Sequence, residues 1–150
     1  WSKALDQELT YLEDFIELEE LRQDHNFELE LRLPPVDTSS YLIAPFLLMP
    51  FVENAFKHLS QNPREKNRIV LHIDLQNGKL LFSISNSTSI TYQKTEDILS
   101  YGGIGLKNVK RRLDLIYQDQ YELHIDQQED FYEVKLELAL LAVGSKQLIQ

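Results

Sequence analysis

The hydrophobic positions at the start of the chain follow first a helical and then a strand period. From about Leu5 to Arg22, apolar side chains recur every three or four residues between acidic and amide ones, which predicts an amphipathic helix. This strip resembles a short heptad seam, so the helix packs either on the rest of the domain or on a second copy of itself. From Phe27 to Leu33 apolar residues alternate with charged ones, which predicts a half-buried strand that ends at Pro34.

An apolar stretch with two prolines follows, from Tyr41 to His58. Pro45 is compatible with the first turn of a helix, whereas Pro50 is expected to kink the helix or to restart it. The pattern predicts a helix from Phe51 to Leu59.

The second half of the chain predicts two pairs of strands, separated by a loop and a helix. The first pair, Ile69–Leu75 and Leu80–Asn86, is joined by Asn77-Gly78, the favoured pair of residues for a tight hairpin. The polar stretch Ser87–Tyr101 has no sustained period and predicts a long loop, of the kind that often serves as a lid. The remaining predictions are a helix at Leu106–Tyr117, with Leu106, Val109, Leu113 and Ile116 facing inward, and strands at Tyr121–Asp126 and Tyr132–Leu140.

This order of elements predicts an α/β (α+β) two-layer sandwich, in which helices cover one face of a mixed, largely antiparallel sheet. A chain of 150 residues, 43% of them hydrophobic, is long enough for one core of ordinary size, so we expect one compact domain. The doubly wound dinucleotide fold is disfavoured because no strand runs directly into the glycine run that begins at Gly102.

Charge and composition exclude several functional classes. The formal net charge of -9 disfavours non-specific binding to nucleic acid or to anionic lipid, so we expect no nucleic-acid partner and no membrane contact. The absence of cysteine excludes a disulfide framework and a thiolate metal site. No apolar stretch approaches the roughly 20 residues that cross a bilayer, and no signal sequence opens the chain. Because Trp1 stands before a helical pattern without an initiating methionine, we expect a piece of a longer protein.

The helix predicted from residue 51 carries three polar groups suited to a metal-bound phosphate. Asn54, Lys57 and His58 stand at i, i+3 and i+4 and share one helix face. An Asn carbonyl oxygen suits Mg²⁺, a Lys ammonium suits the phosphates, and an imidazole can donate a hydrogen bond to them. The alternative is a solvated pair of Glu53 and Lys57 beside an incidental Asn54.

A glycine run about fifty residues later offers a second part of such a site. The glycines at 102, 103 and 105 let the backbone approach a ligand closely, and the free amides of the helix that follows attract anions. Four basic residues follow within six positions: Lys107, Lys110, Arg111 and Arg112. They alternatively form a solvated face or a partner surface. Together the two segments predict a magnesium-nucleotide site.

Both segments resemble motifs of a known family. The run Pro50-Phe51-Val52-Glu53-Asn54-Ala55-Phe56-Lys57-His58 resembles the N box of LytS-like sensor histidine kinases, and Gly103 to Tyr117 resembles their glycine box. These kinases belong to the GHKL superfamily, with DNA gyrase, the Hsp90 chaperones and MutL. The resemblance covers roughly residues 5 to 140 and implies a Bergerat-type ATP-binding fold.

The resemblance also implies roles for individual residues. Asn54 would hold Mg²⁺, and Lys57 and His58 would contact the ATP phosphates, so that these three residues are the implied catalytic set. The nucleotide would further be bound by the lid hinge and phosphate loop, which correspond to Gly103, Ile104, Gly105 and Leu106.

The chain departs from the family at its middle box, which is usually Asp-x-Gly-x-Gly. Here the segment is Asn86-Ser87-Thr88-Ser89, so Asn86 stands where an Asp would read the adenine amino group. An Asn carbonyl still accepts that hydrogen bond, but it lacks the charge, and the missing glycines stiffen the loop. A degenerate module of the same fold, with weak or no nucleotide binding and a role in dimerisation and partner contact, therefore remains an alternative.

The phosphorylated histidine of the family lies on a helix that precedes the one at residue 5, in a setting that His25, His58, His72 and His124 do not match. The resemblance thus implies phosphoryl transfer to a histidine outside this chain and then to a response regulator, of LytTR type, so the chain alone is expected not to phosphorylate itself. Hydrolytic relatives carry a Glu at the position of Pro50, so a free-standing ATPase or a protein-serine kinase is disfavoured.

The resemblance finally implies a division of the chain. Residues 1–23 would be the C-terminal helix of a dimerisation and phosphoacceptor hairpin, through which the full-length protein forms a homodimer. Residues 24–142 would be the ATP-binding catalytic domain, and 143–150 a tail. The whole would lie on the cytoplasmic side of a bacterial membrane protein.

Overall fold

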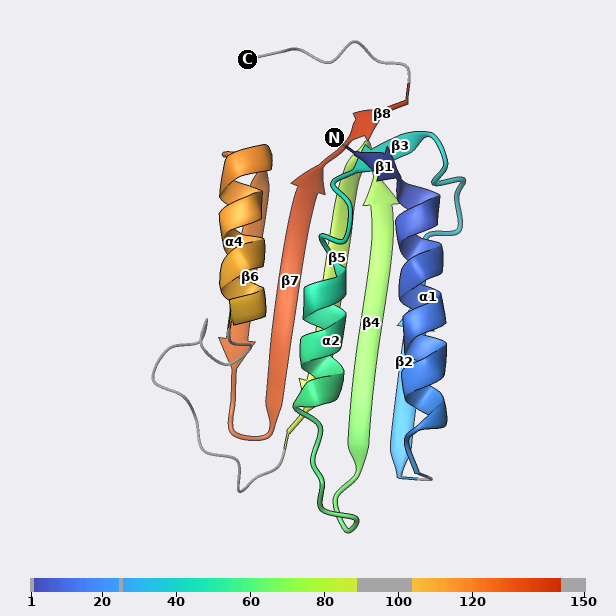
Figure 1. Cartoon of the computed structure of the whole chain (residues 1–150), viewed down its shortest axis with the longest axis vertical. Helices are drawn as coiled ribbons and strands as arrows, with labels where there is room; N and C mark the ends of the chain where they lie inside the picture. Colours follow the sequence, from blue (N-terminus) through green and yellow to red (C-terminus); the bar gives the residue numbers. More distant parts are fainter. Residues whose placement is uncertain (1, 25, 89–103, 144–150) are drawn as a thin grey trace.

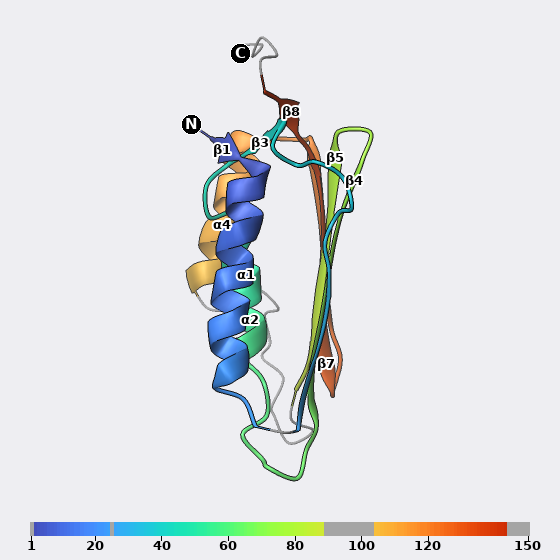
Figure 2. The same ribbon diagram turned by 90° about the vertical axis from the view of Figure 1, so that its right-hand side faces the viewer.

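The computed structural model describes residues 2–24, 26–88 and 104–143, which form two layers. Within these residues, the helices α1, α2 and α4 lie on one face of a five-stranded sheet, as Figures 1 and 2 show. The elements are β1 (Lys3–Ala4), α1 (Leu5–Leu21), β2 (Phe27–Arg32), β3 (Tyr41–Ile43), α2 (Met49–Lys57), β4 (Asn67–Gln76), β5 (Lys79–Ser87), α4 (Ile104–Ile116), β6 (Tyr121–Gln127), β7 (Phe131–Ala139) and β8 (Leu141–Ala142). The predicted two-layer sandwich is confirmed.

The main sheet has the order β2-β4-β5-β7-β6. Only the pair β2 and β4 is parallel within it, and the other neighbours are antiparallel, so the predicted mixed, largely antiparallel sheet is correct. A second small sheet, β1-β3-β8, closes one end of the molecule (Figure 1). Its strands were not predicted, because two or three residues are too few to show an alternating pattern.

The predicted hairpin between β4 and β5 is confirmed. The strands pair from Ile69 with Asn86 to Gln76 with Lys79, and the two residues between them turn the chain. Asn77 has φ 53° and Gly78 has φ 75°, so both central residues adopt the left-handed conformation of the favoured hairpin turn. The Asn-Gly pair therefore sets the register of the central strands.

Replacing Gly78 by alanine is expected to lower the free energy of unfolding by about 1 kcal/mol, because a side chain at φ 75° is strained. Space is not the cause, since a Cβ at this position would approach only the Tyr41 ring, at 3.8 Å. Gly105→Ala is the control, because Gly105 lies in α4, a Cβ there would meet no described atom within 4 Å, and alanine favours a helix. Urea unfolding measures both, and a Gly78→Ala variant as stable as the parent contradicts the argument.

The strip of apolar residues on α1 is part of the hydrophobic core of the chain. Leu5, Leu9, Leu12 and Ile16 are at most 5% exposed, and Phe15 packs edge-on against Phe56 of α2 at 6.1 Å. Of the two alternatives, packing on the rest of the domain is therefore the one observed. The assignment of residues 1–23 to a dimerisation hairpin stays a prediction. The apolar strip is buried in this chain, so it is not available as the contact between two copies.

The two other helices differ from the prediction in detail. Pro50 stands in the first turn of α2, so it restarts a helix, whereas Pro45 lies outside any helix in the turn before α2. In α4 the prediction that Ile116 faces inward is wrong, since Ile116 is 50% exposed. Tyr117, four residues after the buried Leu113, takes the inward direction, and its hydroxyl accepts a hydrogen bond from the Ala44 amide.

Candidate functional site

The segments that carry the predicted site approach the same end of the sheet. Helix α2 packs on β5 and against α4. Its C-terminal end, the last residues of β5 and the first turn of α4 all point toward one end of the molecule, as Figure 1 shows. Three segments that are separate in sequence thus face a common region on the helical side of the sheet.

Asn54 is a buried polar residue on α2. It is 5% exposed among apolar neighbours on the same helix, and its side-chain oxygen Oδ1 has no hydrogen-bond partner among the described residues. Leaving a buried acceptor unsatisfied costs about 1–3 kcal/mol, so such a group in a folded protein needs an explanation. An oxygen ready for a ligand explains it, which weakens the alternative that Asn54 is incidental.

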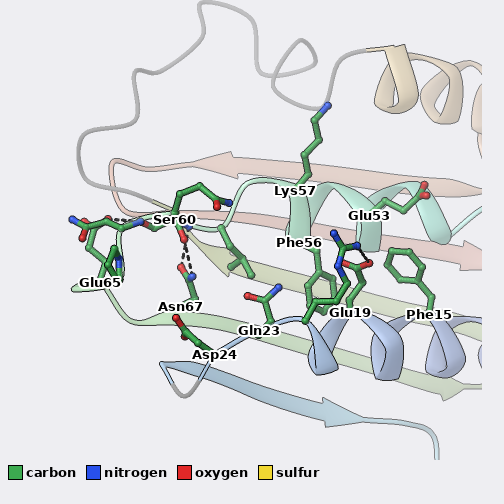
Figure 3. Close-up of a pocket in the computed structure, with 15 residues that line it drawn as sticks. Phe15, Glu19, Gln23, Asp24, Glu53, Phe56, Lys57, Ser60, Glu65 and Asn67 are labelled. Carbon is green, nitrogen blue, oxygen red and sulfur yellow. Dashed lines mark hydrogen bonds and ion pairs between the residues drawn. The ribbon is translucent and has the colours of Figure 1, made fainter.

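Lys57 and His58 end the same helix. Lys57 is the last residue of α2 and is exposed, and Figure 3 shows its side chain directed away from Phe56. His58 is the half-buried residue that caps α2, and its backbone amide donates to the Asn54 carbonyl at 3.2 Å. Glu53 points in another direction than Lys57, so the figure gives no support to the solvated pair of the alternative interpretation.

Asn86 lies near the end of β5 and is 2% exposed. Its side-chain nitrogen donates to the Ser87 carbonyl at 3.1 Å, which leaves the side-chain oxygen as the group that accepts a hydrogen bond. The chain beyond it is held tightly, because Thr88 donates through its amide to the Asp130 carbonyl at 2.9 Å and through its hydroxyl to the Glu129 carbonyl at 3.2 Å. Thr88 therefore stands where the family has a glycine, and two hydrogen bonds hold it in place.

The start of α4 offers backbone amides. Gly103 lies outside the described residues, and α4 begins at Ile104. A Cβ at Gly105 would meet no atom of the described residues within 4 Å, so that part of the chain leaves the backbone open to a ligand there. Leu106 is 2% exposed and its side chain belongs to the core, so only its backbone can serve the site. First-turn amides lack helical partners and attract anions, and no acidic residue in that turn opposes one.

The basic cluster on α4 divides into exposed and engaged side chains. Hydrogen bonds to the Tyr121 hydroxyl, at 3.0 Å, and to the Asp114 carboxylate raise the pKa of Lys110 above its usual value. Arg112 donates to the Pro45 carbonyl at 2.7 Å. The other two basic side chains are exposed. The cluster is therefore partly structural, and only its exposed members are free to meet a ligand or a partner.

A pocket of about 660 Å³ opens on the other side of α2, toward α1 (Figure 3). Phe15 and Phe56 lie along it, and the acidic Glu19, Glu53, Asp24 and Glu65 outnumber the basic Arg22 and Lys57 in its lining. Of the predicted site residues only Lys57 lines it. Because an acidic lining repels a triphosphate, this pocket does not replace the predicted site.

Comparison with known proteins reveals several relatives, although no protein-family model matches the chain. The sensor protein LytS of Staphylococcus saprophyticus is 31% identical over 137 residues, which cover 83% of this chain and 23% of LytS. The sensor histidine kinase BtsS of Escherichia coli K12 is 23% identical over 129 residues, 86% of this chain and 22% of BtsS.

Solved structures of histidine kinases share the fold. The catalytic domain of the histidine kinase ThkA matches with a TM-score of 0.59 at 13% identity, over 93% of this chain and 95% of that domain. Full-length ShkA in complex with AMPPNP matches with a TM-score of 0.64 at 18% identity, over 96% of this chain and 32% of ShkA. The chain is a homologue of the LytS-like sensor histidine kinases.

The chain spans less than a quarter of the length of these sequence relatives. The ThkA match, in contrast, covers nearly all of both chains, so the fold of a separately solved kinase catalytic domain extends over nearly the whole of this one. The recognition made from the N box and the glycine box is therefore confirmed, and the individual site residues remain predictions.

Sequence reasoning missed the role of three residues whose side chains hold the turn before α2. These are Glu8 on α1, Arg112 on α4 and Tyr117 directly after α4. A signal was present for Glu8, which stands three residues after Leu5 and four before Leu12, on the apolar side of the helix. A charged residue in that position is rare unless it has buried partners.

Proposed function

We propose that this chain is the ATP-binding catalytic domain of a two-component sensor histidine kinase. The observation that carries the proposal is the Oδ1 of buried Asn54, which has no hydrogen-bond partner within the described part of the chain. Asn54 lies on a helix that packs against α4, the helix that follows the glycine run. The Asn54 oxygen can bind a cation, and the first-turn amides of α4 can bind an anion. A chelate of Mg²⁺ and ATP combines the two.

The residues present fit Mg²⁺, because Asn54 offers a neutral oxygen and Mg²⁺ takes its other ligands from water and phosphate. When bound, the ion offsets the charge that develops on the phosphate oxygens. Lys57, exposed at the end of α2, would contact the phosphates as a mobile cation, and His58 would add a hydrogen bond. At the other end of the ligand, the Asn86 oxygen would accept from the adenine amino group.

Catalysis by such a site is a matter of position and charge. The amides of Ile104, Gly105 and Leu106, together with Gly103, would hold the phosphates in line with the acceptor. A nitrogen of an acceptor imidazole outside this chain would attack the γ-phosphorus. The bond from that phosphorus to the bridging oxygen would break, and ADP would carry the electron pair away. A response regulator, of LytTR type, would then take the phosphoryl group.

The histidines of the described residues are engaged elsewhere or placed unsuitably as acceptors. His72 contacts Glu30 on the sheet face away from the helices, and His124 is exposed on β6. His58 belongs to the proposed site itself. We therefore expect no stable label on the chain when it is incubated alone with ATP labelled in the γ-phosphate.

The proposal extends to the organisation of the whole protein. Residues 24–142 would form the catalytic domain, 143–150 a tail, and 1–23 the link to a dimerisation hairpin through which two copies associate. None of the helices in the described residues is long and apolar enough to cross a bilayer. We place this chain on the cytoplasmic side of a membrane-bound sensor.

A degenerate module of the same fold is the second candidate. The observation that favours it is the segment at Asn86–Thr88, where a neutral amide replaces a carboxylate and a bonded threonine stands where the family has glycine. Such a module would act through dimerisation and partner contacts.

Titration of the chain with ATP, with Mg²⁺ and then with EDTA, separates the two candidates. The catalytic domain is expected to bind Mg-ATP with a dissociation constant below about 1 mM, which corresponds to roughly 4 kcal/mol, and to bind much more weakly without the metal. Calorimetry or the shift of the unfolding temperature measures this. No binding below millimolar nucleotide would establish the degenerate module instead.

A further inference from the structure

Residues 44–48, here called the α2 entry segment, lead directly into the helix that carries Asn54. A buried carboxylate on α1 holds this segment. Glu8 is 0% exposed, its Oε1 accepts from the Phe46 amide at 3.0 Å, and its Oε2 accepts from the Leu48 amide at 3.3 Å. Lys3 compensates the charge, with its ammonium 3.1 Å from the same carboxylate. Glu8 thus binds two backbone amides at the start of α2.

The same segment is held from α4. Arg112 donates to the Pro45 carbonyl at 2.7 Å and to the Phe46 carbonyl at 3.4 Å. The Tyr117 hydroxyl accepts from the Ala44 amide at 3.0 Å, and burial of that hydroxyl raises the pKa of Tyr117. Side chains from two helices therefore meet the backbone of one short segment, and they tie α1, α2 and α4 together.

The held conformation is not one that the segment would choose alone. Phe46 has φ 56°, the left-handed region that side chains other than glycine avoid, and its ring is 50% exposed. Such outliers persist where the surroundings hold them in place. Two hydrogen bonds at Phe46 supply that restraint, because its amide donates to the Glu8 carboxylate and its carbonyl accepts from Arg112.

Helix α2 has no capping group of its own. Its N-cap residue, Leu48, makes no side-chain capping bond, and no acidic residue lies in the first turn. The Glu8 carboxylate takes this role from another helix, because it accepts the Leu48 amide and places negative charge near the positive end of α2. The Glu8 contact thus restrains the backbone at the residue that precedes α2.

We propose that Glu8 is a positioning residue for the nucleotide site, which sets the place of Asn54 by holding the α2 entry segment. The identity of the ligand in this inference, Mg-ATP, rests on the proposed function. It adds that Arg112 opposes Glu8 from α4, so that the helix with the phosphate-binding amides and the helix with the metal-binding oxygen are held to one another.

The test uses Glu8→Gln, which keeps the shape of the side chain but removes its charge and one of its two acceptor oxygens. The first readout is the side-chain amide resonance of Asn54 in ¹⁵N spectra without nucleotide, assigned by its loss in Asn54→Ala. This resonance is expected to move in Glu8→Gln. The second readout is the dissociation constant for Mg-ATP, which is expected to rise about tenfold, equivalent to 1.4 kcal/mol.

Two controls separate positioning from general stability. Glu17→Gln makes the same chemical change on the exposed side of α1, and Ile16→Val weakens the core at the far end of the helix. Neither is expected to move the Asn54 resonance or to change the affinity more than about twofold, at temperatures well below unfolding. If Glu8→Gln does not fold, Arg112→Lys, which releases the segment from α4, is expected to shift the same resonance.

An Asn54 resonance that stays in place in the folded Glu8 or Arg112 variant overturns the inference, whatever the affinity. So does a Glu8 variant with a moved resonance and the affinity of the parent. If the parent does not bind Mg-ATP but the resonance moves, the proposed function fails, while the positioning of Asn54 by Glu8 is supported.

Discussion

Asn54→Ala is expected to raise the free energy of unfolding by about 1 kcal/mol without ligand, while it weakens Mg-ATP binding about a hundredfold. The gain in stability arises because the buried Oδ1 has no partner among the described residues, and its removal relieves a cost of about 1–3 kcal/mol. Alanine also favours a helix over Asn by roughly 0.6 kcal/mol, and the small void that it leaves offsets part of the gain. The loss of affinity follows from the loss of the oxygen proposed to hold Mg²⁺.

Opposite signs of the two effects make this experiment decisive. Urea unfolding measures stability and calorimetric titration measures affinity, both on the same samples. Asp14→Ala on α1 is the matched control, since it replaces an exposed residue of similar size and helix preference. An Asn54→Ala variant that is less stable than the parent and binds Mg-ATP equally well would make Asn54 a structural residue and remove the basis of the proposed site.

Leu12→Ala is expected to lower the free energy of unfolding by about 2–4 kcal/mol, the usual cost of truncating a buried leucine. Leu12 is 1% exposed and belongs to the hydrophobic core of the chain, so we expect the loss of stability in the monomer itself. Leu18→Ala, on the same helix at 64% exposure, is expected to change stability by less than about 0.5 kcal/mol.

The pair of leucine variants also tests the role of α1. Urea unfolding at several protein concentrations distinguishes a core helix from a dimer seam, because only a dimer makes the midpoint depend on concentration. For Leu12→Ala we expect a lower midpoint that does not change with concentration. If Leu12→Ala left the monomer as stable as the parent and abolished self-association, the seam would face a second copy.

Most of the fold could be predicted from the sequence because its long elements carry their own period. Alternation along β4 and β5, with Asn77-Gly78 between them, was sufficient to predict the hairpin that the structure has. The three-and-four spacing of α1 and α4 was likewise sufficient for their bounds within a residue or two. The strands β1, β3 and β8 escaped prediction, because a few residues paired across the chain leave no local pattern.

The candidate site was predictable to a smaller degree. Spacing alone placed Asn54, Lys57 and His58 on one helix, but it did not distinguish buried Asn54 from exposed Lys57. Leu106 was included for its place in the motif, and its side chain proves to belong to the core. The inward direction at the end of α4 was assigned to Ile116 instead of Tyr117, because both fall within the range that a helical period allows.

By itself the sequence determined the kinds of element, their order and the chemistry on offer: an amide, a lysine and an imidazole on one helix, and glycines before another. Only the tertiary structure decided that the apolar strip of α1 is a core face, that Asn54 keeps an unsatisfied oxygen, and that Glu8 reaches the start of α2. The reason is physical. Periodicity arises from neighbours along the chain, whereas burial and hydrogen-bond partners arise from segments far apart in sequence, which come together only when the chain folds.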